Sequence, residues 1–214
     1  MIDVGNYDIT VYGKGDYTGV ADTQFEIKPA SITACVGDAI EDQVYTGSAI
    51  TPDVILELIS DEGTEEEFTY RLAADTDYTM SFQKNINVGT AEISCTGTGN
   101  FTDIGTLTFR IVPCSIKSDT VTVQAMKDQA YTGIPIEEKP VVLFNGNPLT
   151  EGTDYTLSWN DNTDAGKAEV TITGIGNFSG IRNEPFNITP LAIDSDSVTA
   201  SEIKIGRASC RERV

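Results

Sequence analysis

The sequence predicts an all-β protein built from tandem repeats, and three observations carry this prediction. The segment 3–32 recurs without a gap at 87–116 and again at 164–193. Inside each copy apolar residues alternate with polar ones, which is the period of a half-buried β-strand. No stretch of the chain keeps the period of an amphipathic helix. Self-similarity on this scale indicates one structural unit repeated along the chain.

The strands follow from the alternation. In "AEVTITG" the residues Ala168, Val170 and Ile172 share one face, and the polar residues between them share the other. The segment "AEISCTG", 91–97, repeats this pattern, and "DYTLSW", 154–159, shows the same alternation earlier in the repeat. We therefore expect antiparallel strands joined by tight turns, among them a hairpin turn at Asn145-Gly146.

The front half of the unit also repeats. "VYTGSAITP", 44–52, matches "AYTGIPIEEKP", 130–140, so complete repeats are expected at 33–113 and 114–190. The remaining pieces are then the C-terminal half of a truncated repeat, 1–32, the start of a further repeat, 191–203, and a tail, 204–214.

Each complete repeat has the number and spacing of short strands that predict a β-sandwich. The joins "KPASIT", "VPCSIK" and "TPLAID" are short and contain proline, which favours a semi-rigid, elongated array over freely jointed domains. The half-repeat 1–32 lacks its partner strands. We therefore expect its apolar positions, such as Ile9, Val11 and Phe25, to be uncovered.

The tail "KIGRASCRERV", 204–214, differs in character from the rest of the chain. Its four basic residues would suit a nucleic-acid or membrane-binding arm. However, Ile205–Val214 resembles a short-read sequencing adapter translated as codons. We interpret 204–214, including Cys210, as non-native and exclude it from the fold prediction.

Composition excludes several classes of function. The net charge of −19 repels nucleic acid and anionic lipid surfaces. No apolar run approaches the roughly 20 residues of a membrane span. With no histidine and only four cysteines, a zinc site of the Cys/His type and nucleophile–histidine catalysis are excluded. We expect no enzyme activity, no cofactor, no metal and no membrane insertion.

The stretch "TGIGNFSG", 173–180, resembles a phosphate-binding loop. A phosphate loop must open a helix, whose N-terminus supplies N–H donors. Here an extended segment follows, and the third glycine is replaced by Asp103 in the middle copy. We therefore interpret the glycines as a tight turn or bulge between two strands.

Two loops resemble cation sites. In "NDNTDAG", Asn160–Gly166, acidic and amide side chains alternate as in a calcium loop, but the twelfth position is Thr171 instead of glutamate. An Asn/Asp-rich turn is the simpler interpretation. The acidic loop "SDEGTEEE", 60–67, could bind a cation or a basic partner, or could be a solvated loop, and the sequence leaves this open.

Several single residues suggest a binding or catalytic role, but each also has a structural explanation. An exposed Trp159 could stack on a sugar, but its alternation with polar residues favours the core. Cys95 stands where the other copies have Val11 and Ile172, which predicts a buried thiol. Cys35 and Cys114 begin neighbouring repeats and are expected to lie too far apart for a disulfide. The recurring Asp77 and Asp154 precede the same strand in both repeats and are expected to be structural.

The recurring pattern, "YTG-x-P-I" followed by "G-T-D-Y-T-L-S-W" and "A-G-x-A-x-V-T-I-T-G-x-G-N-F-x-G", resembles the tandem Ig-like repeats of large bacterial surface proteins, mostly Gram-positive. The resemblance covers about residues 1–203 and carries no functional residue, so binding residues are unknown. It implies an extracellular, cell-surface or secreted location.

Three functions suit this resemblance. The first is a stalk or spacer that projects another domain from the cell surface. The second is an adhesin whose repeats bind a host glycan or protein. The third is an accessory module of a secreted carbohydrate- or peptidoglycan-active enzyme. A spacer allows its loops to vary between repeats, whereas a binder keeps an exposed aromatic or polar cluster in each one.

Overall fold

The computed structural model describes residues 3–60, 68–193, 199 and 201. The all-β prediction is confirmed: across these residues the chain forms strands and one short 3-10 turn, η1 (Ile32–Ala34), and contains no α-helix. The chain divides into two compact units. The first comprises Met1–Ser115 together with Gly174–Ser179, and the second comprises Ile116–Thr173 and Gly180–Val214.

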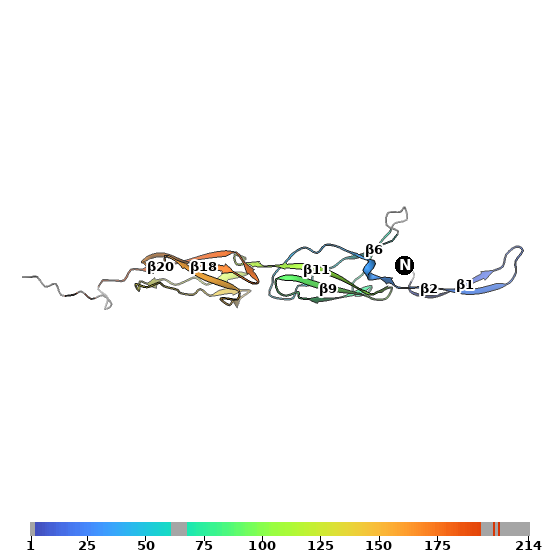
Figure 1. Cartoon of the computed structure of the whole chain (residues 1–214), viewed down its shortest axis with the longest axis horizontal. Coiled ribbons are helices and arrows are strands. Elements are labelled where there is room, and N and C mark those ends of the chain that lie inside the picture. The colour runs from blue at the N-terminus through green and yellow to red at the C-terminus, as the bar shows by residue number, and fades with distance from the viewer. Residues whose placement is uncertain (1–2, 61–67, 194–198, 200, 202–214) are drawn as a thin grey trace, which may run out of the picture. The chain divides into compact units, whose positions relative to one another are not determined.

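The strands recur in the same order along the chain (Figure 1). The strands up to residue 115 are β1 (Gly5–Tyr12), β2 (Val20–Ile27), β3 (Ala30–Ser31), β4 (Val36–Gly37), β5 (Gln43–Val44), β6 (Leu56–Ser60), β7 (Phe68–Arg71), β8 (Tyr78–Gln83), β9 (Gly89–Gly97), β10 (Phe101–Thr102), β11 (Ile104–Val112) and β12 (Cys114–Ser115). They are followed by β13 (Val121–Val123), β14 (Gln129–Ala130), β15 (Val142–Phe144), β16 (Asn147–Pro148), β17 (Tyr155–Asn160), β18 (Gly166–Gly174), β19 (Phe178–Ser179) and β20 (Ile181–Thr189).

Two kinds of sheet occur once in each unit. A four-stranded sheet has the order β5-β11-β9-β8 in the first unit and β14-β20-β18-β17 in the second. A three-stranded sheet has the order β4-β6-β7 in the first unit and β13-β15-β16 in the second. In the first unit both sheets contribute to one core, in which Leu56 of β6 joins Ile93 of β9 and Ile111 of β11. This is the arrangement of a β-sandwich.

The expectation of purely antiparallel pairing is wrong at the sheet edges. β5 pairs with β11, and β14 with β20, in parallel over two residues each. The antiparallel neighbours are much longer, as in the pairing of β9 with β11. Parallel strands require a crossover rather than a hairpin, and here the intervening strands provide it. A two-residue strand is too short to show alternation, so the sequence pattern did not reveal these pairs.

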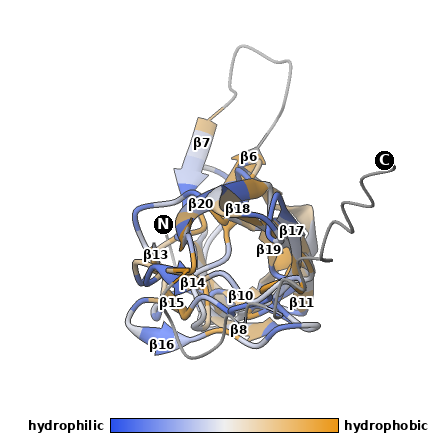
Figure 2. Ribbon diagram, turned by 90° about the vertical axis from the view of Figure 1, so that its left-hand side faces the viewer, coloured by the Kyte–Doolittle hydropathy of each residue, from blue (hydrophilic) through white to orange (hydrophobic). Residues whose placement is uncertain are grey.

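The alternation predicted for the long strands is confirmed. In β9 the side chains of Ala91, Ile93 and Cys95 are at most 1% exposed, and the residues between them are more accessible. In β18 the side chains of Val170 and Ile172 are fully buried. Figure 2 colours the ribbon by hydropathy, and β18 and β20 contain both hydrophobic and hydrophilic residues. One face of each long hairpin therefore supplies the core.

Tyr78 begins β8 and anchors the core of the first unit. Its ring is 1% exposed, and its hydroxyl donates a hydrogen bond of 2.7 Å to the carbonyl oxygen of Val54. Burial is the largest cause that raises the pKa of this hydroxyl above its ordinary value of 10.0. The neutral phenol is therefore the form that the fold stabilises.

We expect Tyr78→Phe to reduce stability at neutral pH and to reduce the sensitivity of the fold to alkali. Loss of the bond to Val54 should lower the free energy of unfolding by about 1 kcal/mol, with a buried acceptor left behind. Because the folded-state pKa of Tyr78 is raised, its contribution to stability is fully present below about pH 10 and is lost as pH rises through the folded-state value. Urea unfolding at pH about 8 and about 11 should show a smaller alkaline loss in the variant. An equal loss in Tyr78→Phe and in the exposed-site control Tyr12→Phe would contradict this.

The hairpin of β1 and β2 has an uncovered apolar face, as expected. Among the residues that the structure describes, these two strands pair only with each other. Ile9, Val11 and Phe25 are 41%, 54% and 44% exposed, whereas their counterparts in β9 and β11 are nearly fully buried. Tyr7 and Phe25 stack on this hairpin with ring centroids 5.4 Å apart.

An isolated two-stranded hairpin is only marginally stable. We therefore expect limited chymotrypsin digestion to cut first at Tyr12 or Tyr17, while the two larger sheets of each unit stay intact. Mass spectrometry of the early fragments measures this order. Cleavage inside β9 or β18 at the same rate as at Tyr12 would refute it.

Candidate functional site

The most constant feature of the chain is the corner between the two long strands of each hairpin. It occurs at Gly13–Thr18, Gly97–Thr102 and Gly174–Ser179. The first glycine has no room for a side chain: a Cβ at Gly97 would lie 2.6 Å from the backbone nitrogen of Thr102, and one at Gly174 would lie 2.7 Å from that of Ser179. The first glycine therefore permits a close approach of two backbone segments.

The second glycine of the corner and the residue directly after the corner need a left-handed backbone. The second glycine has φ of 70°, 62° and 64° in the three corners. Directly after the corner, Gly19 and Gly180 have φ of 102° and 85°, and Asp103 keeps the same region with φ of 70°. Aspartate is among the few residues that tolerate this conformation. The sequence changes at this position while the backbone does not.

The corner makes no phosphate cradle. Several of its backbone donors already have acceptors in the protein: Phe178 N donates to Ile175 O at 3.0 Å, and Gly97 N donates to Asp103 O at 3.0 Å. A strand follows each corner, so no helix N-terminus is present to supply further donors. The geometry is that of a tight turn between two strands, as the sequence predicts.

The fourth residue of the corner does something that sequence analysis missed. Asn100 accepts a hydrogen bond from Val4 N at its Oδ1, at 2.9 Å, and its Nδ2 donates to Asp3 Oδ1 at 3.0 Å. Its backbone carbonyl accepts from Ala30 N at 3.0 Å. Next to it β10 pairs in parallel with β3. One asparagine thus holds a turn and a strand that both precede its own repeat.

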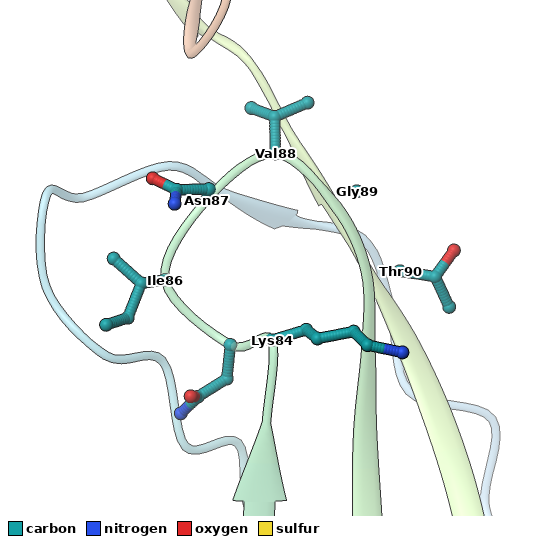
Figure 3. Close-up of a pocket in the computed structure, with 7 residues that line it drawn as sticks. Lys84, Ile86, Asn87, Val88, Gly89 and Thr90 are labelled. Carbon is teal, nitrogen blue, oxygen red and sulfur yellow. The ribbon is translucent and has the colours of Figure 1, made fainter.

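Asn177 makes the same set of bonds. Its Oδ1 accepts from Val88 N at 2.9 Å, its Nδ2 donates to Asn87 Oδ1 at 3.1 Å, and its carbonyl accepts from Cys114 N at 3.0 Å. β19 pairs in parallel with β12. Val88 lies at the apex of the loop that joins β8 to β9 (Figure 3). The ring of Phe178 also meets that of Tyr45 edge-on, with centroids 5.6 Å apart.

We call this arrangement the corner-on-turn joint. It consists of the corner asparagine, the Asp/Asn-Val-Gly turn and a two-residue parallel strand pair. The first joint is formed by Asn100 and the second by Asn177, and both lie within the first unit. The signal in the sequence was the simultaneous recurrence of this asparagine and of the Val-Gly turn. Nothing local indicates that they meet, because Val4 and Asn100 are 96 residues apart.

The loop resembling a calcium site has a structural use for one of its amides. Asn162 Nδ2 donates to Ile136 O at 3.0 Å, and Ile136 N donates to Asn162 O at 2.8 Å. Asn85 makes the same two bonds with Ile50 in the other repeat. In the part of the chain that the structure describes, no three His, Cys, Asp or Glu side chains gather as a metal site. The acidic loop at 60–67 lies, apart from Ser60, outside the described residues.

The recurring aspartates close a turn. Asp77 Oδ2 accepts from Ala73 N at 2.8 Å and from the hydroxyl of Tyr70 at 3.3 Å, and Asp154 Oδ2 accepts from Thr150 N at 2.8 Å. The negative charge of Asp77 is the largest cause that raises the pKa of Tyr70. These contacts give the recurring aspartate a structural role.

The tryptophan and the thiols also have structural surroundings. Trp159 is half-buried against the core of the second unit, and its Nε1 donates to Glu138 O at 3.2 Å. Cys35, Cys95 and Cys114 form no disulfide. Burial raises the pKa of the Cys95 and Cys35 thiols, which makes both poor nucleophiles.

Comparison with protein-family models, with curated proteins and with solved structures finds no match. Among the described residues no helix has the length and apolar character needed to cross a membrane. The corner-on-turn joint therefore stands as the candidate functional site on its geometry alone.

The corner predicts a ranking of glycine substitutions. Gly97→Ala should lower the free energy of unfolding by about 3 kcal/mol, because its Cβ would overlap backbone atoms that cannot move away. Gly99→Ala should cost about 1 kcal/mol through its left-handed φ. Gly105→Ala is the matched control, since its Cβ would make only ordinary contacts at 3.8 Å. Chemical denaturation measures the three values, and equal effects at Gly97 and Gly105 would disprove the close approach.

Proposed function

We propose that this chain is part of a bacterial cell-surface or secreted repeat protein, in which Ig-like β-sandwich repeats act as a stalk or spacer. The observation that carries the proposal is the corner-on-turn joint. The same three hydrogen bonds and the same strand pair occur at Asn100 and at Asn177, 77 residues later. A spacer needs joints that repeat, because a fixed joint transmits a fixed geometry from one repeat to the next.

We expect the joints to resist bending for a physical reason. Each joint combines bonds on a turn, on a side chain and on a separate strand, so rotation about a single linker bond would break several of them. Each net hydrogen bond contributes about 0.5–1.5 kcal/mol. Three to four such bonds exceed thermal energy by several fold. The covalent link keeps the partners close, which favours re-formation after each opening.

Loop variation supports a spacer over a binder. In the second repeat β15 and β16 are joined by Asn145-Gly146, with φ of 49° and 80°, the left-handed values of a tight hairpin turn. The equivalent β6 and β7 of the first repeat are separated by the acidic segment 61–67. The residues that stay constant include buried residues, turn residues and joint residues, and also the exposed Thr79 and Ser81 of β8 with their counterparts Thr156 and Ser158 of β17. The support for a spacer therefore rests on the loop that differs between the repeats.

Distance measurement between the repeats tests the spacer. With labels at exposed Thr108 and Lys167 of the full chain, we expect a single narrow distance distribution in the unmodified protein. Asn177→Ala removes the side-chain bonds to Asn87 and Val88 and should broaden the distribution. Asn183→Ala, which removes only an exposed bond to Glu169, is the control. A broad distribution in the unmodified chain would overturn the proposal.

Binding measurements separate the spacer from the adhesin. A glycan array probed with the full chain should show no saturable signal. Saturable binding that survives unfolding of the β1–β2 hairpin, but not unfolding of both units, would assign the repeats a binding role instead.

A further inference from the structure

A third set of the joint's turn residues lies exposed in the second unit. Asp164, Ala165 and Gly166 occupy the places of Asn87, Val88 and Gly89 in the repeat. Gly166 has φ of 145°, close to the 143° of Gly89 and the 153° of Gly5. Gly166 thus already has the φ that its counterparts have in the two joints. The side chain of Ala165 is exposed, and no described residue accepts a hydrogen bond from its N–H.

The residues that correspond to the joint's two-residue strand are also exposed in the second unit. Leu191 and Ala192 correspond to the strands β3 and β12, which pair with a corner, but here they form no strand. Leu191 is 40% exposed, and the following Ile193 is 86% exposed. Its counterparts Ile32 and Ile116 are 2% and 0% exposed. The isoleucine at this position is thus exposed in the second unit and buried next to each of the two joints.

The tyrosine that contacts the corner aromatic in the first unit has a counterpart in the second unit. Tyr131 is the counterpart of Tyr45, whose ring meets the corner aromatic Phe178. Tyr131 N donates to Thr189 O at 2.9 Å, just as Tyr45 N donates to Val112 O at 2.9 Å. The ring is therefore carried by the same local backbone in both repeats.

We propose that Asp164–Gly166, Leu191–Ala192 and Tyr131 form a docking site for the Gly-x-Gly-Asn-aromatic corner of another repeat, and that this site selects asparagine over aspartate at the fourth corner position. An asparagine there accepts from Ala165 N and donates to the Asp164 carboxylate. Asn100 does the same with Val4 and Asp3. The inference rests on the proposed function only in treating the joints as links between repeats.

Selection follows from the donors available. An aspartate at the fourth corner position can accept from Ala165 N, but it has no N–H to offer to Asp164. Two carboxylates would then face each other at hydrogen-bond distance, and like charges at this separation disfavour ionisation of both. Discrimination thus comes from a repulsive element as well as a missing bond.

The chain itself carries the disfavoured corner. In the β1–β2 hairpin the corner Gly13–Thr18 has Asp16 at the fourth position. Its aromatic Tyr17 is 78% exposed, whereas Phe101 and Phe178 are each 3% exposed. The corner of one copy can therefore meet the docking site of another copy. Asp16 facing Asp164 opposes this association.

Single-charge variants of the full chain test the selectivity. In Asp16→Asn the corner gains the missing donor, so copies should dock with a dissociation constant about tenfold lower than in the unmodified protein. Asp164→Asn should have a similar effect, because the new side-chain amide at position 164 can donate to Asp16. The readout is the concentration-dependent shift of the Ala165 amide by NMR, with sedimentation equilibrium to measure association.

The control variant is Asp119→Asn, which removes the same charge from an exposed turn outside the docking site. It should behave as the unmodified protein does. Equal association in the control, or no shift of Ala165 in either Asp16→Asn or Asp164→Asn, would overturn the inference. A negative result here leaves the labelled-distance experiment unaffected, since that experiment tests joints within one chain. The two proposals can therefore fail separately.

Discussion

Close approach of two backbone segments at each corner is the constraint on which the other features depend. Because Gly97 and Gly174 lack a Cβ, the chain can turn back against its own backbone within a few residues. This tight reversal brings the carbonyl and the side chain of the following asparagine to the outer end of the hairpin. There they meet a turn and a strand at once. A wider corner would move the carbonyl away from β3 or β12, and the three bonds of a joint would no longer converge.

The parts of the fold that the sequence could predict are those with a local period. β9 and β18 are long enough for alternation to reveal which side chains are buried, and Ile93 and Val170 lie where the period places them. The short parallel pairs and the joints have no such signal. The amide of Asn177 reaches Val88, 89 residues earlier, and a one-dimensional pattern does not show which distant backbone group an amide will meet. Position 103 is the opposite case. The residue is aspartate where the other copies have glycine, but the backbone keeps the same left-handed region.

Amide chemistry suits joints in a chain with a net charge of −19. A carboxamide offers both a donor and an acceptor, so one side chain can satisfy a backbone N–H and a neighbouring oxygen together. In the described joints the facing pairs are Asn100 with Asp3 and Asn177 with Asn87, so each pair contains at least one amide. A pair of acids would add repulsion to a protein already rich in negative charge. Asparagine at the corner therefore allows these contacts to form in an acidic chain without two acids facing each other.

The joints are small, and this has a consequence for association. A joint formed within one chain benefits from the high effective concentration that the linker provides, whereas the same contact between separate copies must overcome the loss of translational freedom. A contact strong enough to fix neighbouring repeats can thus remain weak between molecules. In the docking site that we propose, the acid at position 16, where the other corners have an amide, opposes association between copies. The few hydrogen bonds of a joint and a single unfavourable charge pair would thus distinguish contacts within one chain from contacts between chains.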